Sequence, residues 1–475
     1  MSVAARQPIA VRRAAPLAVV VWVGLVVLAA IGAWQLILAW QDGLSGGRDF
    51  VQDYAAVVKI GHGRDPYEPY NDVTEAIFGG PPHKGPLYSF HAPSSLPLLI
   101  WLLPVASVGG YTGAFLSWGL VSLLSLWAIC WLTLRTVRAP RAPVAGILAA
   151  LALIALPAIR ANFDEGQLNV AVAAGMVGCW AARRSGRSGL AGVLLGAAFA
   201  LKPIPGLFFL YYLWRRDWRL LGASVATLAV LSIIGLALSG LEGAWLWATV
   251  NYPSHASVWP GYPDNASLRG FFTRIFGPSD WKPRPPFPLA YASTLLWLAT
   301  GAVLVLAAML ATCRSGSPDD RARPVAARLR LLLTQAPPAP NDPADDVEIA
   351  ALTVLSLLVT PIVWPHYYVV LVMPVMVVVV ALARSIVDGR RSVSPGRATS
   401  ALARRAGSGW LVSSVALAAL VLGAAMLAPA HYVEPYAGNG GQQLVALLLV
   451  FGAALAALRL AGRYQGGDAS PAATR

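Results

Sequence analysis

Long apolar runs separated by short arginine-rich segments constrain this chain more than any other feature of its sequence. Hydrophobic residues make up 57% of the 475 residues and charged residues 12%, proportions that a soluble domain of this length would not show. Helices satisfy every backbone polar group inside a bilayer, so we expect an all-α polytopic membrane protein. The net charge of +14 comes from arginines between the runs, as in cytoplasmic loops, and does not indicate nucleic-acid binding.

Segments of about 20 apolar residues, or fewer where Pro and Gly interrupt a helix, predict about twelve transmembrane helices. They belong to a single integral membrane domain, residues 1–475. The expected spans are residues 16–40, 112–134, 143–160, 168–182, 188–202, 203–214, 219–240, 288–312, 348–363, 367–384, 409–429 and 442–460. The short segment 94–108, interrupted by Pro97 and Pro104, is expected to enter the membrane part way from the outer side.

The arginine clusters orient these spans, because positive charge accumulates in cytoplasmic loops. The clusters place both chain termini in the cytoplasm, together with two loops that we expect to be flexible, residues 314–346, rich in Pro, Ala, Asp and Arg, and residues 385–408, rich in Arg, Ser and Gly. Residues 41–111 then form the first extracytoplasmic loop, with the membrane-embedded helix in it, and residues 241–287 form another.

Acidic, aromatic and histidine side chains are concentrated in the first outer loop, between Gln41 and Pro93. In a mostly apolar membrane protein, such a concentration marks the natural place for chemistry. The three cysteines stand in apolar surroundings without the spacing of a disulfide framework or a metal site. The outer face is therefore where we expect a functional site.

Five motifs follow one another along the chain, and each places polar groups on the predicted outer side. They are DFVQDYAAVVKIGHGRDPYEPYND from Asp49, FDEGQLN at 163–169, AGVLLGAAFALKPIPGLFFLYYLWRRDWR at 191–219, NASLRGFFTR at 265–274 and PIVWPHYY at 361–368. In this order they resemble the polyprenyl-phosphate-sugar-dependent glycosyltransferases of the GT-C superfamily, and within them glycosyltransferase family 87. The resemblance extends from about Trp34 to Tyr368. It implies a GT-C-type helix bundle in the bacterial plasma (inner) membrane with an extracytoplasmic active site.

The resemblance implies an inverting transfer in which an aspartate of the first outer loop is the general base. Asp49 matches that position, and a carboxylate can take the proton from an attacking hydroxyl. Asp53, one helical turn later, is the reserve base. The alternative role for Asp49 is to cap the helix expected at 50–60.

The resemblance also implies groups that bind the leaving phosphate and the two substrates. The cations placed for the donor phosphate are Lys202, Arg269 and Arg274, and His366 is a second catalytic candidate, through the phosphate or the acceptor. Candidate sugar and acceptor contacts are Tyr54, Tyr67, Gln167, Asn169, Asn265, Trp364 and Tyr367. Each has a simpler alternative, because lysine snorkels and aromatic residues anchor at membrane interfaces.

The expected partners are a polyprenyl-phosphate sugar donor, with mannose favoured, a glycolipid or glycan acceptor and the lipid bilayer. No cofactor is expected, and no obligatory metal, because the loop lacks the paired acids that a hard cation requires. Arabinofuranosyl transfer, a lipid-linked glycan ligase and a transporter are the alternatives. The chain departs from the family pattern at 91–93 and at Pro365, which leaves the acceptor open.

Overall fold

The computed structural model of this protein describes residues 10–46, 49–67, 71–79, 109–137, 142–253, 259–277, 289–311, 343–391 and 439–464, together with positions 324 and 327. All regular elements within these residues are helices, which confirms the expected all-α class. The predicted embedded segment 94–108 and the predicted span 409–429 lie outside the described residues.

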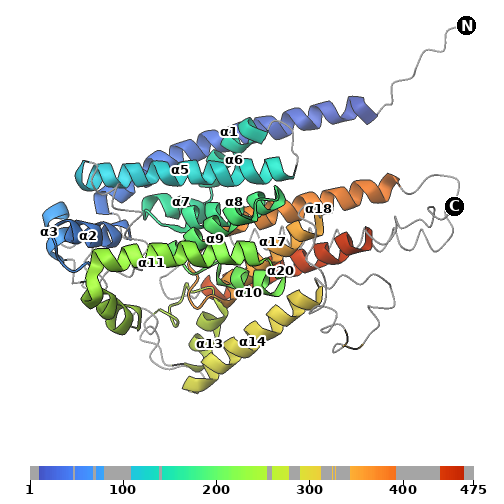
Figure 1. Cartoon of the computed structure of the whole chain (residues 1–475). Helices are drawn as coiled ribbons and strands as arrows, with labels where there is room; N and C mark the ends of the chain where they lie inside the picture. The colour runs from blue at the N-terminus through green and yellow to red at the C-terminus, as the bar shows by residue number, and fades with distance from the viewer. Residues whose placement is uncertain are drawn as a thin grey trace, which may run out of the picture.

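The helices of the first half are α1 (Ala10–Gly46), α2 (Phe50–Gly61), α3 (Asn71–Phe78), α5 (Gly110–Thr136), α6 (Ala142–Ile154), α7 (Pro157–Asp164), α8 (Asn169–Arg184), α9 (Ser188–Leu201) and α10 (Gly206–Trp214). Those of the second half are α11 (Trp218–Leu246), the π-helical turn η2 (Trp247–Asn251), α13 (Leu268–Phe276), α14 (Ala290–Ala311), α17 (Pro343–Val359), the 3-10 helix η3 (Pro365–Leu371), α18 (Val372–Arg391) and α20 (Asn439–Tyr464). Figure 1 shows α2 and α3 at one end of the bundle, and the start of α1 and the end of α20 toward the other.

Four of these helices are long and apolar enough to cross a membrane, over Val19–Ser45, Gly110–Thr136, Trp218–Asn251 and Tyr291–Ala311. The pair α6 and α7, bent by 87°, counts as a fifth if it is one broken span. Only 6% of the apolar window of α14 is buried inside the protein, so its remaining apolar surface needs lipid around it. The chain is a multi-pass membrane protein, whereas the figure of about twelve spans stays a prediction.

Several predicted boundaries differ from the observed ones. The loop predicted at 314–346 ends in the first turn of α17, where Asp345 and Asp346 are stabilised by the positive end of the helix dipole. Its counterpart at 385–408 begins within α18, which continues to Arg391. The outer loop predicted at 241–287 begins as helix, because α11 bends at Gly240, with φ of 70°, and then continues. The same region also contains α13.

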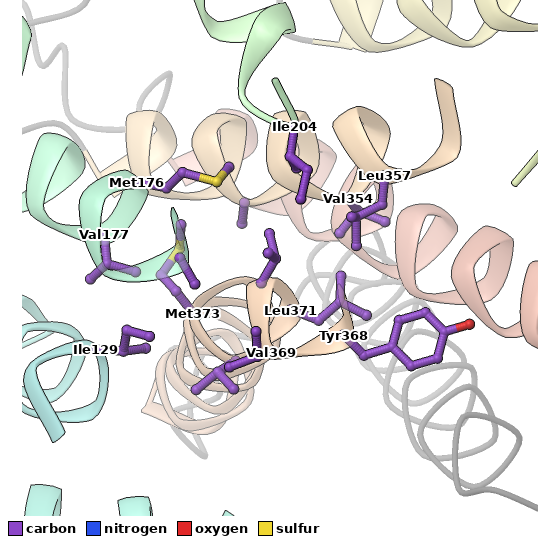
Figure 2. Close-up of a cluster of buried hydrophobic side chains, with 14 of the residues drawn as sticks. Ile129, Met176, Val177, Ile204, Val354, Leu357, Tyr368, Val369, Leu371 and Met373 are labelled. Carbon is purple, nitrogen blue, oxygen red and sulfur yellow. The ribbon is translucent and has the colours of Figure 1, made fainter. Parts of the chain in front are cut away.

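The 3-10 helix η3 is held in the centre of the apolar core. Figure 2 shows Val369, Leu371 and Met373 beside Ile129, Met176, Val177 and Ile204, which come from α5, α8 and the turn after α9. The hydroxyl of Tyr368 donates to Gln443 of α20 at 3.1 Å. Because its neighbours are close-packed on several sides, η3 holds His366 in a fixed place.

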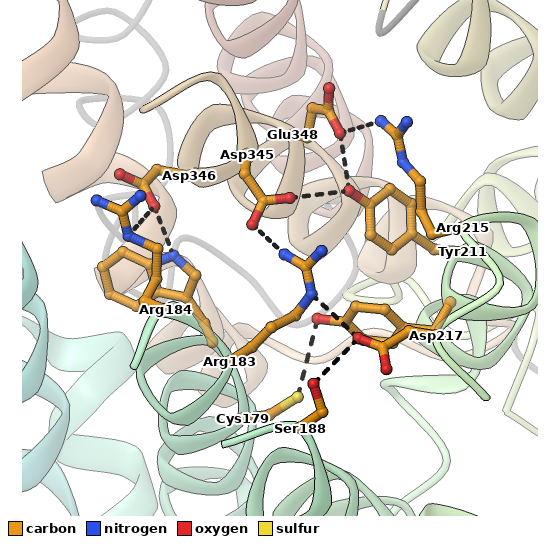
Figure 3. Close-up of polar contacts among 12 residues, drawn as sticks. Cys179, Arg183, Arg184, Ser188, Tyr211, Arg215, Asp217, Asp345, Asp346 and Glu348 are labelled. Atoms are coloured by element: carbon orange, nitrogen blue, oxygen red, sulfur yellow. Dashed lines mark hydrogen bonds and ion pairs between the residues drawn. The ribbon is translucent and has the colours of Figure 1, made fainter. Parts of the chain in front are cut away.

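Buried ion pairs join α17 to α8 and to the segment around α10 (Figure 3). We call this group the α17 charge cluster, and its members are Arg183, Arg184, Arg215, Asp345, Asp346 and Glu348. Arg215 pairs with Glu348, each side chain being 2% exposed or less, and the hydroxyl of Tyr211 donates to the same carboxylate at 2.7 Å. Each charge is compensated by a partner, as burial requires.

Breaking one of these pairs should destabilise the protein more than removing both charges. Arg215→Met leaves the Glu348 carboxylate buried without its cation and should cost about 3–5 kcal/mol of unfolding free energy. The double variant Arg215→Met/Glu348→Leu should recover most of this loss. Thermal unfolding in detergent measures both, and equal destabilisation of the single and double variants would contradict the role given to the pair.

Candidate active site

The turn between α7 and α8 builds the centre of the site. It follows a helix that begins with Pro157, and it closes at Gly166, whose φ of 64° favours glycine. A Cβ at Gly166 would lie 2.5 Å from the Cβ of Phe50, so the turn can approach α2 this closely only with glycine there. The amide of Phe50 donates to the carbonyl of Glu165 at 2.9 Å, which fastens the turn to the start of α2.

Asp49 stands at the N-cap of α2, yet its side chain makes no capping hydrogen bond. Its carboxylate instead accepts a hydrogen bond from the side-chain amide of Gln167, 118 residues away in the sequence. The amide of Gln52 is a weaker partner at 3.4 Å. The carboxylate is therefore oriented toward the α7–α8 turn and does not cap α2.

Lys202 ends α9 in an extended conformation just before Pro203. Its ammonium group donates to Asn169 Oδ1 at 2.9 Å and to Gln167 Oε1 at 3.4 Å, and it lies 4.1 Å from the centre of the Tyr367 ring. Gln167 thus bonds both Lys202 and Asp49. A cation held in this way by neutral groups keeps charge available for an anionic ligand.

His366 completes the cluster from η3. The side-chain amide of Asn162 donates to the His366 carbonyl at 2.9 Å, and Nδ1 of the ring lies 3.0 Å from the Glu165 carboxylate. Burial, and then the charge of Lys202, lower the pKa of His366 to about 3, against a smaller opposing effect of Asp49. The ring is therefore neutral at physiological pH, in the turn between two predicted spans.

One ligand atom from each of Asp49, Glu165 and His366 lies within 4.8 Å of the other two, a spacing that a divalent cation could bridge. Two features favour the arrangement without a cation. Glu165 and the His366 ring already contact each other, and the Lys202 ammonium stands beside the cluster. The absence of an obligatory metal stays a prediction.

Asp53 lies one turn along α2 and is 7% exposed, and among the described residues one of its oxygens has no hydrogen-bond partner. Burial, followed by the charge of Asp49, raises the pKa of Asp53 to about 8. Two aromatic candidates lie in the same apolar group of side chains: Tyr54 packs against Phe50 at 6.2 Å between ring centres, and Tyr67 is fully buried.

Four predicted site residues make their contacts elsewhere. The Asn265 amide donates to the carbonyls of Pro260 and Pro361 and accepts from the amides of Ser267 and Val363, so it joins two backbone segments. Arg274 donates to the carbonyls of Tyr262 and Asn265 at 3.0 and 2.8 Å. Arg269 lies over Trp297, and Trp364 packs on Trp259 and Tyr262.

Sequence reasoning missed Glu165 and Asn162, which hold the ring and the carbonyl of His366. A signal for both was present, because they stand within or directly before the motif FDEGQLN at the predicted outer end of a span. An acid and a carboxamide beside a turn that contains a glycine with positive φ are typical of a functional site rather than a solvent-exposed loop.

The fold and this cluster define a multi-pass membrane protein with a carboxylate, an ammonium group and an imidazole gathered beyond the ends of its helices. Residues 93–336, just over half of the chain, match the model of Glycosyltransferase family 87, and the chain belongs to that family. The resemblance found in the sequence motifs is thereby confirmed. Asp49 and His366 lie outside the matched range, whereas Gln167 and Lys202 lie inside it.

The chain is also similar to the polyprenol-phosphate-mannose-dependent alpha-(1-2)-phosphatidylinositol mannoside mannosyltransferases of two mycobacteria. It is 30% identical to that of Mycolicibacterium smegmatis over 229 residues, which are 47% of this chain and 44% of the relative. The identity to that of Mycobacterium tuberculosis is 27% over 221 residues, 46% and 43% of the two chains. The chain thus covers less than half the length of each. No solved structure matches this chain.

The raised pKa of Asp53 predicts a pH-dependent stability. The folded protein retains this proton up to about pH 8, while an unfolded aspartate releases it near pH 4, so stability should fall as pH rises through that window. In Asp53→Asn the side chain at position 53 is uncharged at every pH. The thermal unfolding midpoint of this variant should therefore fall less between pH 5 and pH 8 than that of wild type. Asp72→Asn, an exposed acid paired with Arg64, is the control. Parallel pH profiles for wild type and Asp53→Asn would contradict the burial of a protonated carboxyl.

Proposed function

We propose that this chain is an inverting glycosyltransferase that moves a sugar, mannose in the first instance, from polyprenyl phosphate to a glycolipid or glycan acceptor. Asp49 is the general base and Lys202 neutralises the leaving phosphate. The observation that carries the proposal is the convergence of four residues that span more than 300 positions of the sequence. Gln167 bonds both Asp49 and Lys202, and a ring nitrogen of His366 lies within 4.8 Å of the Asp49 carboxylate.

The chemistry follows from these groups. The acceptor hydroxyl gives its proton to the Asp49 carboxylate while its oxygen attacks the anomeric carbon of the sugar. The bond between that carbon and the phosphate oxygen breaks, and the electron pair leaves with the polyprenyl phosphate. The Lys202 ammonium stabilises the charge that grows on the phosphate. No covalent enzyme intermediate forms, so the anomeric configuration inverts.

The names of the two mycobacterial relatives favour mannose as the sugar and a phosphatidylinositol mannoside as the acceptor. Asp49 stands at the start of α2, and α2 lies at the end of the bundle away from the start of α1 and the end of α20 (Figure 1). The positive-inside pattern places the arginine-rich loops in the cytoplasm. The end of the bundle that carries α2 would then face the outside of a bacterial plasma membrane. A polyprenyl chain would then lie in the outer leaflet with its phosphate at the level of Lys202.

Asp49→Asn should reduce sugar transfer by about 100-fold or more, because the amide keeps the shape and hydrogen bonding of the carboxylate but cannot accept the proton. The assay is single-turnover transfer from radiolabelled polyprenyl phosphate mannose, with polyprenyl phosphate arabinose in parallel, by purified folded protein. Asp53→Asn is measured beside it. Near-normal transfer by Asp49→Asn and none by Asp53→Asn would move the base to Asp53, while transfer of neither sugar by wild type would reject the activity.

Lys202→Met should weaken binding of polyprenyl phosphate by about tenfold or more, because a charge-assisted contact to phosphate is lost while an apolar stem remains. Arg269→Met is the matched comparison, since the structure places that guanidinium over Trp297 and not beside Asp49. Binding of fluorescent polyprenyl phosphate measures both affinities. A larger loss with Arg269→Met than with Lys202→Met would place the phosphate at α13 instead.

A further inference from the structure

Glu165 contacts both the start of α2, next to Asp49, and the ring of His366. Its backbone carbonyl accepts a hydrogen bond from the backbone amide of Phe50, the residue after Asp49. Its carboxylate lies 3.0 Å from Nδ1 of His366. The backbone contact does not depend on the side chain, so a substitution at 165 changes the contact with His366 and keeps the link to α2.

The contact between Glu165 and His366 fixes which nitrogen of the ring carries the proton. A carboxylate accepts hydrogen bonds, so Nδ1 must be the protonated nitrogen. The charged groups around the ring are Lys202 after α9, Asp49 before α2 and Glu165 after α7. Burial and the charge of Lys202 outweigh the opposing effect of Asp49 and keep the ring neutral, which leaves Nε2 as a hydrogen-bond acceptor.

We propose that Glu165 is a positioning residue that holds His366 in the Nδ1–H form and presents Nε2 to a hydroxyl of the acceptor next to the reacting one. This inference rests on the proposed function. It gives His366 a role on the acceptor, not on the donor phosphate, because an unprotonated nitrogen repels a phosphate oxygen. It also defines the acceptor chemically as a sugar with two neighbouring hydroxyls at its reactive end.

The geometry supports a paired-hydroxyl acceptor. One ring nitrogen of His366 lies within 4.8 Å of a carboxylate oxygen of Asp49, so the imidazole that carries Nε2 stands beside the proposed base. Neighbouring hydroxyls of a sugar are separated by about one hydrogen-bond length, so one can donate to Asp49 and the other to His366. Asn162 supports this arrangement by holding the His366 carbonyl at 2.9 Å, which fixes the backbone while Glu165 fixes the ring.

The test is a double-mutant cycle with Glu165→Ala and His366→Ala. If Glu165 acts through His366, Glu165→Ala should lower kcat/KM for the acceptor by about tenfold or more in wild type and by less than twofold in the His366→Ala background. The affinity for polyprenyl phosphate should be unchanged within about twofold. Glu165→Gln retains an acceptor oxygen and should recover part of the loss, which a merely structural role would not produce.

Asp42→Asn serves as the control. It removes an acid near the end of α1 that is paired with Arg160 and 61% exposed. Equal losses from Glu165→Ala in both backgrounds, or a loss of donor affinity, would overturn the proposal. Transfer by wild type that EDTA abolishes and Mn²⁺ restores would also overturn it, by making Glu165 a metal ligand. The kinetic measurements require transfer by wild type, so its absence would reject the proposed function and not this inference alone.

Discussion

A charge inside an apolar helix bundle must find a partner, and this requirement organises both polar regions of the protein. In the α17 charge cluster the partners are opposite charges, and the cluster joins α17 to α8 and α10. In the candidate active site Lys202 is held by two carboxamides and an aromatic face. In the first region opposite charges are paired, while in the second the hydrogen bonds of the Lys202 ammonium go to neutral carboxamides.

The sequence predicted the helical class correctly, while the roles of the site residues stay predictions. Apolar runs are a strong signal because each must be long enough to be buried in lipid or protein. The outer-side motifs were sufficient to select Asp49, Gln167, Lys202 and His366, which the structure brings into one connected group. The family assignment made from the same motifs is confirmed by the match over residues 93–336.

The sequence could not distinguish residues proposed to bind substrates from residues whose side chains hydrogen-bond to the backbone of nearby turns. Asn265 and Arg274 stand in a polar motif on the predicted outer side, but their side chains bond carbonyls and amides of nearby turns. The sequence also does not show which residues of distant segments form ion pairs. The arginines at 183, 184 and 215 follow the positive-inside pattern, yet they are bonded to acids of α17 more than 130 positions away. Glu165 was overlooked for the same reason, because its partner His366 is distant in sequence.

The proposed mechanism requires that the donor phosphate binds where Lys202, Gln167 and Asp49 meet. A cryo-electron microscopy map of the protein with bound polyprenyl phosphate tests this most directly. We expect phosphate density within about 4 Å of the Lys202 ammonium, the range of a charge-assisted contact, with the Asp49 carboxylate on the side open to the acceptor. Phosphate density beside Arg269 and Arg274, or at the α17 charge cluster, would contradict it.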